Sequence, residues 1–177
     1  METKETASIG SLQDEKKLKL SSRRWLVLFT FSLISFMNAF HWIQHNIIQD
    51  VIIFYYNNSL PSGTIAQNEA VNWLSLVYML TYIPLVFPAM FLLDYKGLKL
   101  SVGLGGLLTA IGAWVKCGSV NSDRFFVLMI GQTICAIAQV FTLGIPARLS
   151  SLWFGASEVS TATSIGVFGN QLGILIK

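Results

Sequence analysis

Residues 25–50 read WLVLFTFSLISFMNAFHWIQHNIIQD, and this stretch indicates the class of the protein. Its first half is a continuous apolar run, and about 20 such residues can cross the hydrocarbon core of a bilayer as a helix. Its second half carries asparagines, histidines, glutamines and a tryptophan. Polar side chains within a membrane span face a cavity or a partner helix rather than lipid. The stretch therefore predicts a membrane helix with one polar face.

The composition of the whole chain agrees with an integral membrane protein. Of its 177 residues, 53% are hydrophobic and only 12% are charged, whereas soluble domains carry about 25% charged residues. The mean hydropathy is +0.59. Cys117 and Cys135 both lie in apolar runs. They predict buried free thiols rather than a disulfide framework or a metal site.

The net charge of +3 does not indicate a nucleic-acid partner, because the basic residues are clustered beside the first apolar run. Five of the twelve lie just before it: Lys16, Lys17, Lys19, Arg23 and Arg24. Basic residues beside a membrane span favour its cytoplasmic side. Residues 1–22 hold few bulky apolar groups, so we expect them to form a disordered cytoplasmic tail. The apolar run that follows is too long for a cleaved signal peptide.

Five apolar segments are long enough to be candidate membrane helices. They lie at about residues 25–49, 71–93, 100–120, 125–149 and 158–176, of which the last is the least hydrophobic. Glycine and proline are frequent in the second, third and fourth segments, and small residues such as glycine allow membrane helices to approach closely. The sequence therefore predicts an all-α integral membrane protein whose helices pack on one another.

The charges between these segments predict an orientation. The connection after the second segment carries Lys96 and Lys99, whereas the connection before it carries Asp50 and Glu69 and no lysine or arginine. This asymmetry predicts a cytoplasmic N-terminus and an external first loop. Asn57 opens an N-x-S sequence, which can be glycosylated only on the non-cytoplasmic side. We therefore expect a multi-pass protein of the plasma membrane, with Asn57 as a glycosylation site.

The turn after the second segment, FLLDYKGLKL at residues 91–100, resembles the D-[RK]-x-G-[RK]-[RK] loop of the major facilitator superfamily. The resemblance rests on Asp94, Lys96, Gly97 and Lys99. Gly97 permits a sharp reversal, and the carboxylate of Asp94 can cap the next helix or pair with a nearby cation. Tyr95 and Leu98 depart from the pattern, so an ordinary charged turn is the alternative interpretation.

A second stretch, LWFGASEVSTATSIG at residues 152–166, resembles the W-F-x-x-x-E-x-x-x-A-x-x-x-G loop of the same superfamily. Trp153 and Phe154 are expected at the membrane interface, where aromatic rings are favoured. Glu158 lies near the start of the fifth segment, where the helix dipole favours a negative charge. The two loops together imply the N-terminal six-helix half of this superfamily, of which five helices are present.

Within the superfamily, five blocks resemble, in order, the feline leukaemia virus subgroup C receptor-related transporters. The blocks are NAFHWIQ, WLSLVYMLTYIPLVFPAMFLLD, GAWVKCGSV, AQVFTLGIPARLSSLWFG and EVSTATSIGVFGNQLG, which together extend over about residues 23–173. That family is similar to choline and ethanolamine carriers and has been described as a group of haem carriers. The resemblance implies a solute carrier that works by alternating access on a choline-like cation or haem, without a cofactor.

Five residues are the candidates for substrate binding: Trp42, Gln139, Tyr78, Asn38 and Asn170. A quaternary ammonium donates no hydrogen bonds, so its site needs aromatic faces, of which tryptophan is the best. The resemblance places Trp42 against the substrate and Gln139 near a substrate hydroxyl. It places Tyr78 at a cavity-facing aromatic position. Asn38 and Asn170 match polar cavity positions of the family.

Other roles are open for these residues. Trp42 can be an aromatic residue of the interfacial belt, Gln139 can bridge two helices, and Tyr78 can fill the core. His41 and His45 lie one turn apart, but two histidines alone make an incomplete metal site. We therefore expect no metal, and haem ligation by these histidines does not follow from the resemblance.

The apolar segments end at residue 177, where a six-helix half would continue. From this we expect a truncated carrier, with the partial transporter domain at residues 23–177. The alternative is a non-transporting membrane protein that is unstable or associates with a full-length relative. The sequence has no acyl-transfer, phosphate-binding or paired-carboxylate pattern, so we do not expect an enzyme.

Overall fold

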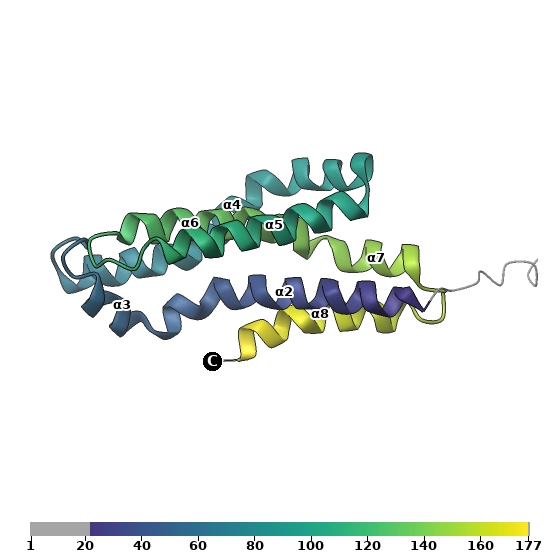
Figure 1. Cartoon of the computed structure of the whole chain (residues 1–177), viewed down its shortest axis with the longest axis horizontal. Helices are drawn as coiled ribbons and strands as arrows, with labels where there is room; N and C mark the ends of the chain where they lie inside the picture. Colours follow the sequence, from purple (N-terminus) through teal and green to yellow (C-terminus); the bar gives the residue numbers. More distant parts are fainter. Residues whose placement is uncertain (1–21, 177) are drawn as a thin grey trace, which may run out of the picture.

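The computed structural model describes residues 22–176, in which every regular element is a helix (Figure 1). The helices are α2 (Arg23–Ile47), α3 (Gln49–Tyr55), α4 (Thr64–Lys96), α5 (Leu98–Cys117), α6 (Phe125–Leu143), α7 (Ile145–Trp153) and α8 (Val159–Leu175). All but residue 22 of the predicted tail, including Lys16, Lys17 and Lys19, lies outside the described residues. The longer helices run along the long axis of the molecule (Figure 1).

Four helical segments are long and apolar enough to cross a membrane. They are Arg23–Ile47, Thr64–Lys96, Leu98–Cys117 and the combined Phe125–Trp153. This confirms the expectation of a multi-pass helical membrane protein. The fifth expected segment forms α8, whose 17 residues are at the short end of the range of about 17–25 residues for a span. The count of five spans stays a prediction.

The helix ends differ from the predicted ones at three places. The first predicted helix, 25–49, is divided at Ile48 into α2 and α3. The second begins at Thr64 rather than at residue 71, because the polar residues before the apolar run continue the same helix. The predicted helix 125–149 is interrupted at Gly144, and a proline occupies the first turn of α7, where its missing N–H has no intrahelical partner to lose.

The turn between α4 and α5 depends on one glycine. Gly97 has a φ of 85°, which residues with a Cβ rarely adopt. The carboxylate of Asp94, at the end of α4, does not cap α5. It pairs instead with Arg148 of α7 at 3.1 Å, and both side chains are largely exposed. Lys96 lies over the ring of Tyr95, with Nζ 5.3 Å from the ring centre.

Two pairs of helices approach each other at glycines. A Cβ placed on Gly112 of α5 would lie 2.8 Å from the backbone oxygen of Gly131 of α6 and 2.5 Å from Sγ of Cys135. A Cβ on Gly169 of α8 would lie 2.8 Å from the backbone oxygen of Ser32 of α2. Gly173 meets the backbone of α2 one turn further along. The close helix packing that the small residues predicted is therefore present.

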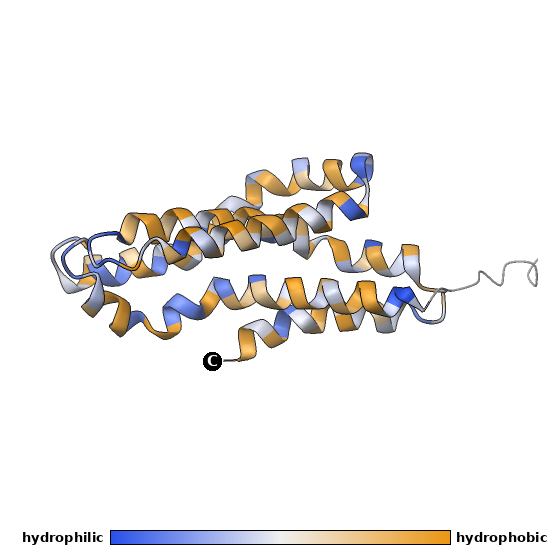
Figure 2. Cartoon of the chain, in the orientation of Figure 1, coloured by the Kyte–Doolittle hydropathy of each residue, from blue (hydrophilic) through white to orange (hydrophobic). Residues whose placement is uncertain are grey.

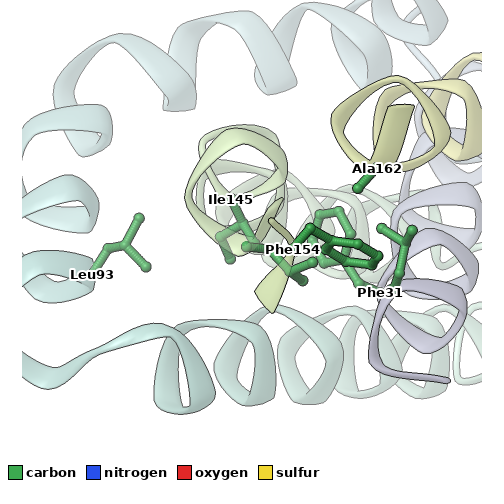
Figure 3. Close-up of a cluster of buried hydrophobic side chains, with 7 residues drawn as sticks. Phe31, Leu93, Ile145, Phe154 and Ala162 are labelled. Atoms are coloured by element: carbon green, nitrogen blue, oxygen red, sulfur yellow. The ribbon is translucent and has the colours of Figure 1, made fainter. Parts of the chain in front are cut away.

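A buried apolar cluster lies where α2 and α8 begin. Its members come from α2, α4, α7, α8 and the loop before α8: Leu28, Phe31, Leu93, Ile145, Leu149, Phe154 and Ala162. Figure 3 shows Phe154 between the helices that carry Phe31 and Ile145. The hydrophilic residues gather mainly at the ends of the helices (Figure 2). This cluster holds the starts of α2 and α8 side by side.

An ion pair joins the same two helix starts. The guanidinium of Arg24 donates to both carboxylate oxygens of Glu158, at 2.5 and 3.3 Å. Arg24 also lies 5.7 Å from the ring centre of Trp25 and 5.3 Å from that of Phe154. The Arg24 side chain is 14% exposed and the Glu158 side chain 38%. The motif at residues 152–166 is thus joined to the start of α2 by the ion pair between Glu158 and Arg24.

Replacing Gly112 by alanine should lower the stability of the chain, because the new methyl group meets the backbone of α6. The matched control is Gly103→Ala on the same helix, where a Cβ meets nothing within 4 Å. We expect a loss of about 1–3 kcal/mol for Gly112→Ala and none for Gly103→Ala. Thermal unfolding in detergent, followed by circular dichroism, measures both. Equal melting temperatures for the two variants would contradict the close approach.

Replacing Glu158 by glutamine should destabilise the chain more than replacing Asp94 by asparagine. The Glu158 pair is bidentate and partly buried, so we expect a loss of about 1–2 kcal/mol. The Asp94 pair is exposed and should contribute less than about 0.5 kcal/mol. The same thermal measurement applies. If Asp94→Asn is as costly as Glu158→Gln, the pair at the helix starts is not the stronger link.

Candidate functional site

Two of the five candidate residues, Trp42 and Tyr78, lie in a small cluster where α2, α4 and α6 meet. Its buried members are Tyr78, Cys135 and Ala136, and Trp42 and Val77 pack against them. Aromatic rings from α2 and α4 therefore lie against small residues of α6. Because Cys135 and Ala136 of α6 are small, the three helices can approach one another closely here.

Trp42 is half-buried and oriented by α4. Its indole N–H donates to the backbone oxygen of Ser75 at 3.3 Å, and its ring stacks on that of Tyr78, with centres 6.3 Å apart and planes inclined by 28°. A tryptophan of an interfacial belt directs its N–H toward water or headgroups. The contacts of Trp42 within the bundle favour an interior role over a belt role.

Tyr78 is 1% exposed. Its hydroxyl lies beside the thiol of Cys135 but has no partner with hydrogen-bond geometry among residues 22–176. The ring fills the core, as one interpretation of the sequence held. Filling the core requires the ring of Tyr78 but not its unpaired hydroxyl group.

Gln139 follows Cys135 by one turn of α6, so it lies on the same face of that helix. Its side chain is half-buried, and its Oε1 atom is buried without a hydrogen-bond partner in the described part of the chain. A bridge between helices would use that oxygen. The structure therefore gives no support to the bridging interpretation of Gln139.

Asn38 bridges three helices. Its Nδ2 donates to Oγ1 of Thr109 on α5 at 3.2 Å and to the backbone oxygen of Cys135 on α6 at 3.0 Å. Its Oδ1 atom has no partner within residues 22–176. Most of its hydrogen-bonding capacity is thus used in packing α2, α5 and α6 together.

Asn170 is separated from the other candidates. It lies half-buried on α8, a helix that packs along α2 and α7. The structure brings Trp42, Tyr78 and the α6 residues together but does not add Asn170 to them. Its predicted role has no geometric support from the described contacts.

Several buried polar atoms near this cluster have no hydrogen-bond partner in the described residues. On α2, α4 and α6 they are Asn38 Oδ1, His45 Nδ1, Tyr78 Oη, Gln132 Oε1 and Gln139 Oε1. A buried polar atom left unpaired costs free energy, so such atoms are rare in structural cores. Three of them are amide oxygens, which can accept a hydrogen bond from a hydroxyl or ammonium group. The ring face of Trp42, on α2, can attract a cation.

The histidines do not form a metal site. His41 Nδ1 lies 3.3 Å from Nζ of Lys116 and 3.2 Å from Nε2 of Gln44. His45 is buried, with Nε2 3.5 Å from Nε2 of Gln44. Within residues 22–176 no group of three His, Cys, Asp or Glu side chains could hold a metal ion. A lysine beside a histidine also disfavours a cation at this place.

Gln132 is a residue that the sequence analysis did not select. It is fully buried on α6, and its Nε2 donates to the backbone oxygen of His41 at 2.9 Å and to that of Trp42 at 3.4 Å. It precedes Gln139 by seven residues, which places both on one face of α6. That spacing of two glutamines in an apolar helix is the signal that could have identified it.

Two hollows lie away from this cluster, along α2 and α5. One, of about 580 Å³, has ten lining residues, which include Thr30, Lys99 and Trp153. The other, of about 310 Å³, has eight, which include Met37, His41 and Thr109. Both have predominantly apolar walls, and neither is lined by a candidate binding residue.

Asn57, the expected glycosylation site, is exposed in the turn after α3. Its Oδ1 accepts a hydrogen bond from Nε2 of Gln67 at 2.9 Å. The hydroxyl of Ser59, the third residue of the acceptor sequence, donates to the backbone oxygen of Ser122 at 2.8 Å. The sequence is therefore at the surface, with its serine held against the loop between α5 and α6.

Comparison with known proteins gives clear relatives. No family model matches the chain. The choline/ethanolamine transporter FLVCR1 of Felis catus is 51% identical over 157 residues, which are 89% of this chain and 27% of the relative. The choline/ethanolamine transporter FLVCR2 of Homo sapiens is 48% identical over 164 residues, 93% of this chain and 30% of the relative.

A more distant organism has a similar relative. An uncharacterized MFS-type transporter of Caenorhabditis elegans, C09D4.1, is 47% identical over 164 residues, 93% of this chain and 27% of the relative. All three are named as transporters rather than enzymes, which agrees with the expectation that this chain is not an enzyme. The chain spans about three tenths of the length of these curated relatives. By sequence, the chain belongs to the feline leukaemia virus subgroup C receptor-related family of transporters.

Proposed function

We propose that this chain forms part of a membrane solute carrier that binds a choline-like cation at Trp42. The observation that carries the proposal is the placement of the Trp42 ring inside the bundle, stacked on Tyr78. Buried amide oxygens without a partner in the described residues lie on α2 and α6, the helices that meet at this ring. A ring face attracts the ammonium group, and an amide oxygen accepts a hydrogen bond from the hydroxyl group. The relatives' names give the same substrate class for those proteins.

Each candidate has a distinct part in this proposal. Trp42 provides the ring face for the ammonium, Gln139 accepts from the hydroxyl, and Tyr78 extends the aromatic surface. Asn38 holds α2 against α5 and α6 and leaves one oxygen for the site. Asn170 has the weakest support, because α8 does not bring it to the cluster.

Haem is less well supported than a small cation. A haem needs a large apolar slot and, in many proteins, an axial histidine. His41 lies against Lys116 and Gln44, and His45 is buried beside Gln44. We therefore prefer the cation as the substrate.

For the orientation in the membrane, we propose five spans with a cytoplasmic N-terminus in the plasma membrane. The start of α2, the α4–α5 turn and the start of α8 lie at one end of the molecule, and α3 lies at the other (Figure 1). The first end carries Arg24, Lys96 and Lys99, and the other carries Asp50 and Glu69. The positive-inside bias supports this direction. α8 would be the fifth and shortest span.

We also propose that the bundle moves as one rigid part during alternating access. The glycine contacts between α5 and α6 and between α2 and α8 leave no room for sliding at those places. A carrier of this superfamily moves two such parts around a central site. The second part would come from sequence beyond the matched three tenths of the relatives.

Replacing Trp42 by alanine should weaken choline binding about tenfold or more, because a partly desolvated cation–π contact contributes about 1–2 kcal/mol. The control is Trp114→Ala on α5, whose side chain is 82% exposed and should not affect binding. Binding is measured with labelled choline on the purified chain in lipid nanodiscs. Equal losses in both variants would show that the effect is not local to Trp42.

Whether the chain transports unaided is a separate test, which decides between a carrier and a non-transporting protein. Cells that express only these 177 residues are compared with cells that express the Trp42→Ala variant, by uptake of labelled choline. Saturable uptake that Trp42→Ala abolishes supports a carrier. Binding without uptake indicates that the chain needs a further part, such as a full-length relative.

Glycosylation tests the orientation. If the first loop is external, the chain should lose apparent mass on treatment with a glycosidase, and Asn57→Gln should abolish that shift. Asn58→Gln is the matched control, because the middle residue of N-x-S tolerates any residue but proline. The shift is read by gel electrophoresis. A shift that survives Asn57→Gln would refute the assignment of this acceptor.

A further inference from the structure

We propose that Gln132 is a positioning residue that fixes the place of Trp42, an inference that rests on the proposed cation site. The side chain of Gln132 reaches from α6 to α2 and binds main-chain atoms there, not the indole ring. It therefore acts on the site through the backbone at residue 42. Gln132 is not one of the five candidate binding residues.

The geometry of the contact supports a specific function for the amide. Nε2 of Gln132 donates to the backbone oxygen of His41 at 2.9 Å and to that of Trp42 at 3.4 Å. Both oxygens belong to the last two turns of α2, which ends at Ile47. Because one nitrogen donates to two consecutive carbonyl groups, it fixes both the position of this part of α2 along the helix axis and its rotation about that axis. An apolar residue of similar size could not do this.

The same carbonyl group has a second contact, from α4. Oγ of Ser75 lies 3.4 Å from the backbone oxygen of Trp42 and donates to Oδ1 of Asn46 at 2.7 Å. The backbone oxygen of Ser75 accepts from the indole N–H of Trp42 at 3.3 Å. Trp42 is thus held from both neighbouring helices, with Gln132 as the contact from α6.

The consequence for the site is geometric. A cation–π contact requires the cation to lie over the ring face, within about 6 Å of its centre. Gln139 is on the same helix face as Gln132, two turns further along. The Gln132 contact therefore fixes the Trp42 ring relative to the oxygen of Gln139. Without this contact, the ring that binds the ammonium group and the oxygen that binds the hydroxyl group would no longer be held at a fixed separation.

A merely structural role predicts something different. If Gln132 only joins α6 to α2, its loss lowers stability without changing the motion of the Trp42 ring or the affinity for a cation. If it positions Trp42, its loss frees the ring and weakens binding in the folded protein. The two roles are therefore distinguished by a spectroscopic signal from Trp42 together with a binding constant.

The experiment uses the full chain in lipid nanodiscs with the other four tryptophans replaced by phenylalanine, so that Trp42 alone is fluorescent. Gln132→Met keeps the length of the side chain and removes both N–H donors. Gln171→Met, at an exposed position of α8, is the matched control. Steady-state anisotropy reports the motion of the ring, and labelled choline gives the affinity.

We expect Gln132→Met to lower the anisotropy of Trp42 and to weaken choline binding about tenfold, while Gln171→Met changes neither. Values equal to those of the control overturn the proposal. If Gln132→Met does not fold, Gln132→Asn replaces it, because the shorter amide cannot reach both carbonyl oxygens. If no variant binds choline, including the unsubstituted chain, the proposed function fails. The anisotropy then still decides whether Gln132 holds Trp42.

Discussion

The structure depends on how closely α2 approaches its neighbours. Lipid tails are as apolar as the side chains that face them, so burial of apolar surface does not draw membrane helices together as it does in water. Contact must come from packing and from hydrogen bonds between helices. In this chain α8 places glycines against the backbone of α2, and Asn38 ties α2 to α5 and α6. The other helices are arranged around that contact.

The two ends of α2 are held by different means. At its start, Arg24 combines an ion pair with Glu158 and two aromatic faces, one of which belongs to Phe154. Near its end, neutral amides and a hydroxyl group bind its carbonyl groups. Charge at the first end suits a position near water. The contacts to the α2 carbonyl groups at the second end are neutral hydrogen bonds, and the one basic side chain described beside them is Lys116, next to His41. The candidate cation site lies in the second region.

Much of the fold could be predicted from the sequence. Long apolar runs predict membrane helices, glycines within them predict close helix packing, and Gly97 predicts a sharp turn. The position of α3 and the break at Gly144 could not be predicted, because both depend on packing rather than on hydropathy. For the candidate site, the resemblance predicted Trp42, Tyr78 and Gln139, and the structure places Trp42 and Tyr78 in one cluster with residues of α6. Gln132 was missed because its role depends on carbonyl groups of another helix. A sequence does not display such contacts.

The polar residues of the site differ in how far the fold itself explains them. Asn38 makes two hydrogen bonds between helices, and Gln132 makes two to α2; both would be retained for packing alone. The side chain of Gln139 makes no such bond within the described chain, and its Oε1 is buried without a partner, as are Asn38 Oδ1 and Gln132 Oε1. A leucine there would remove the cost of an unpaired amide oxygen, which in an apolar environment is about 1–3 kcal/mol. Packing alone therefore does not account for a glutamine at 139, which agrees with the hydrogen bond proposed between its oxygen and a hydroxyl group of the substrate.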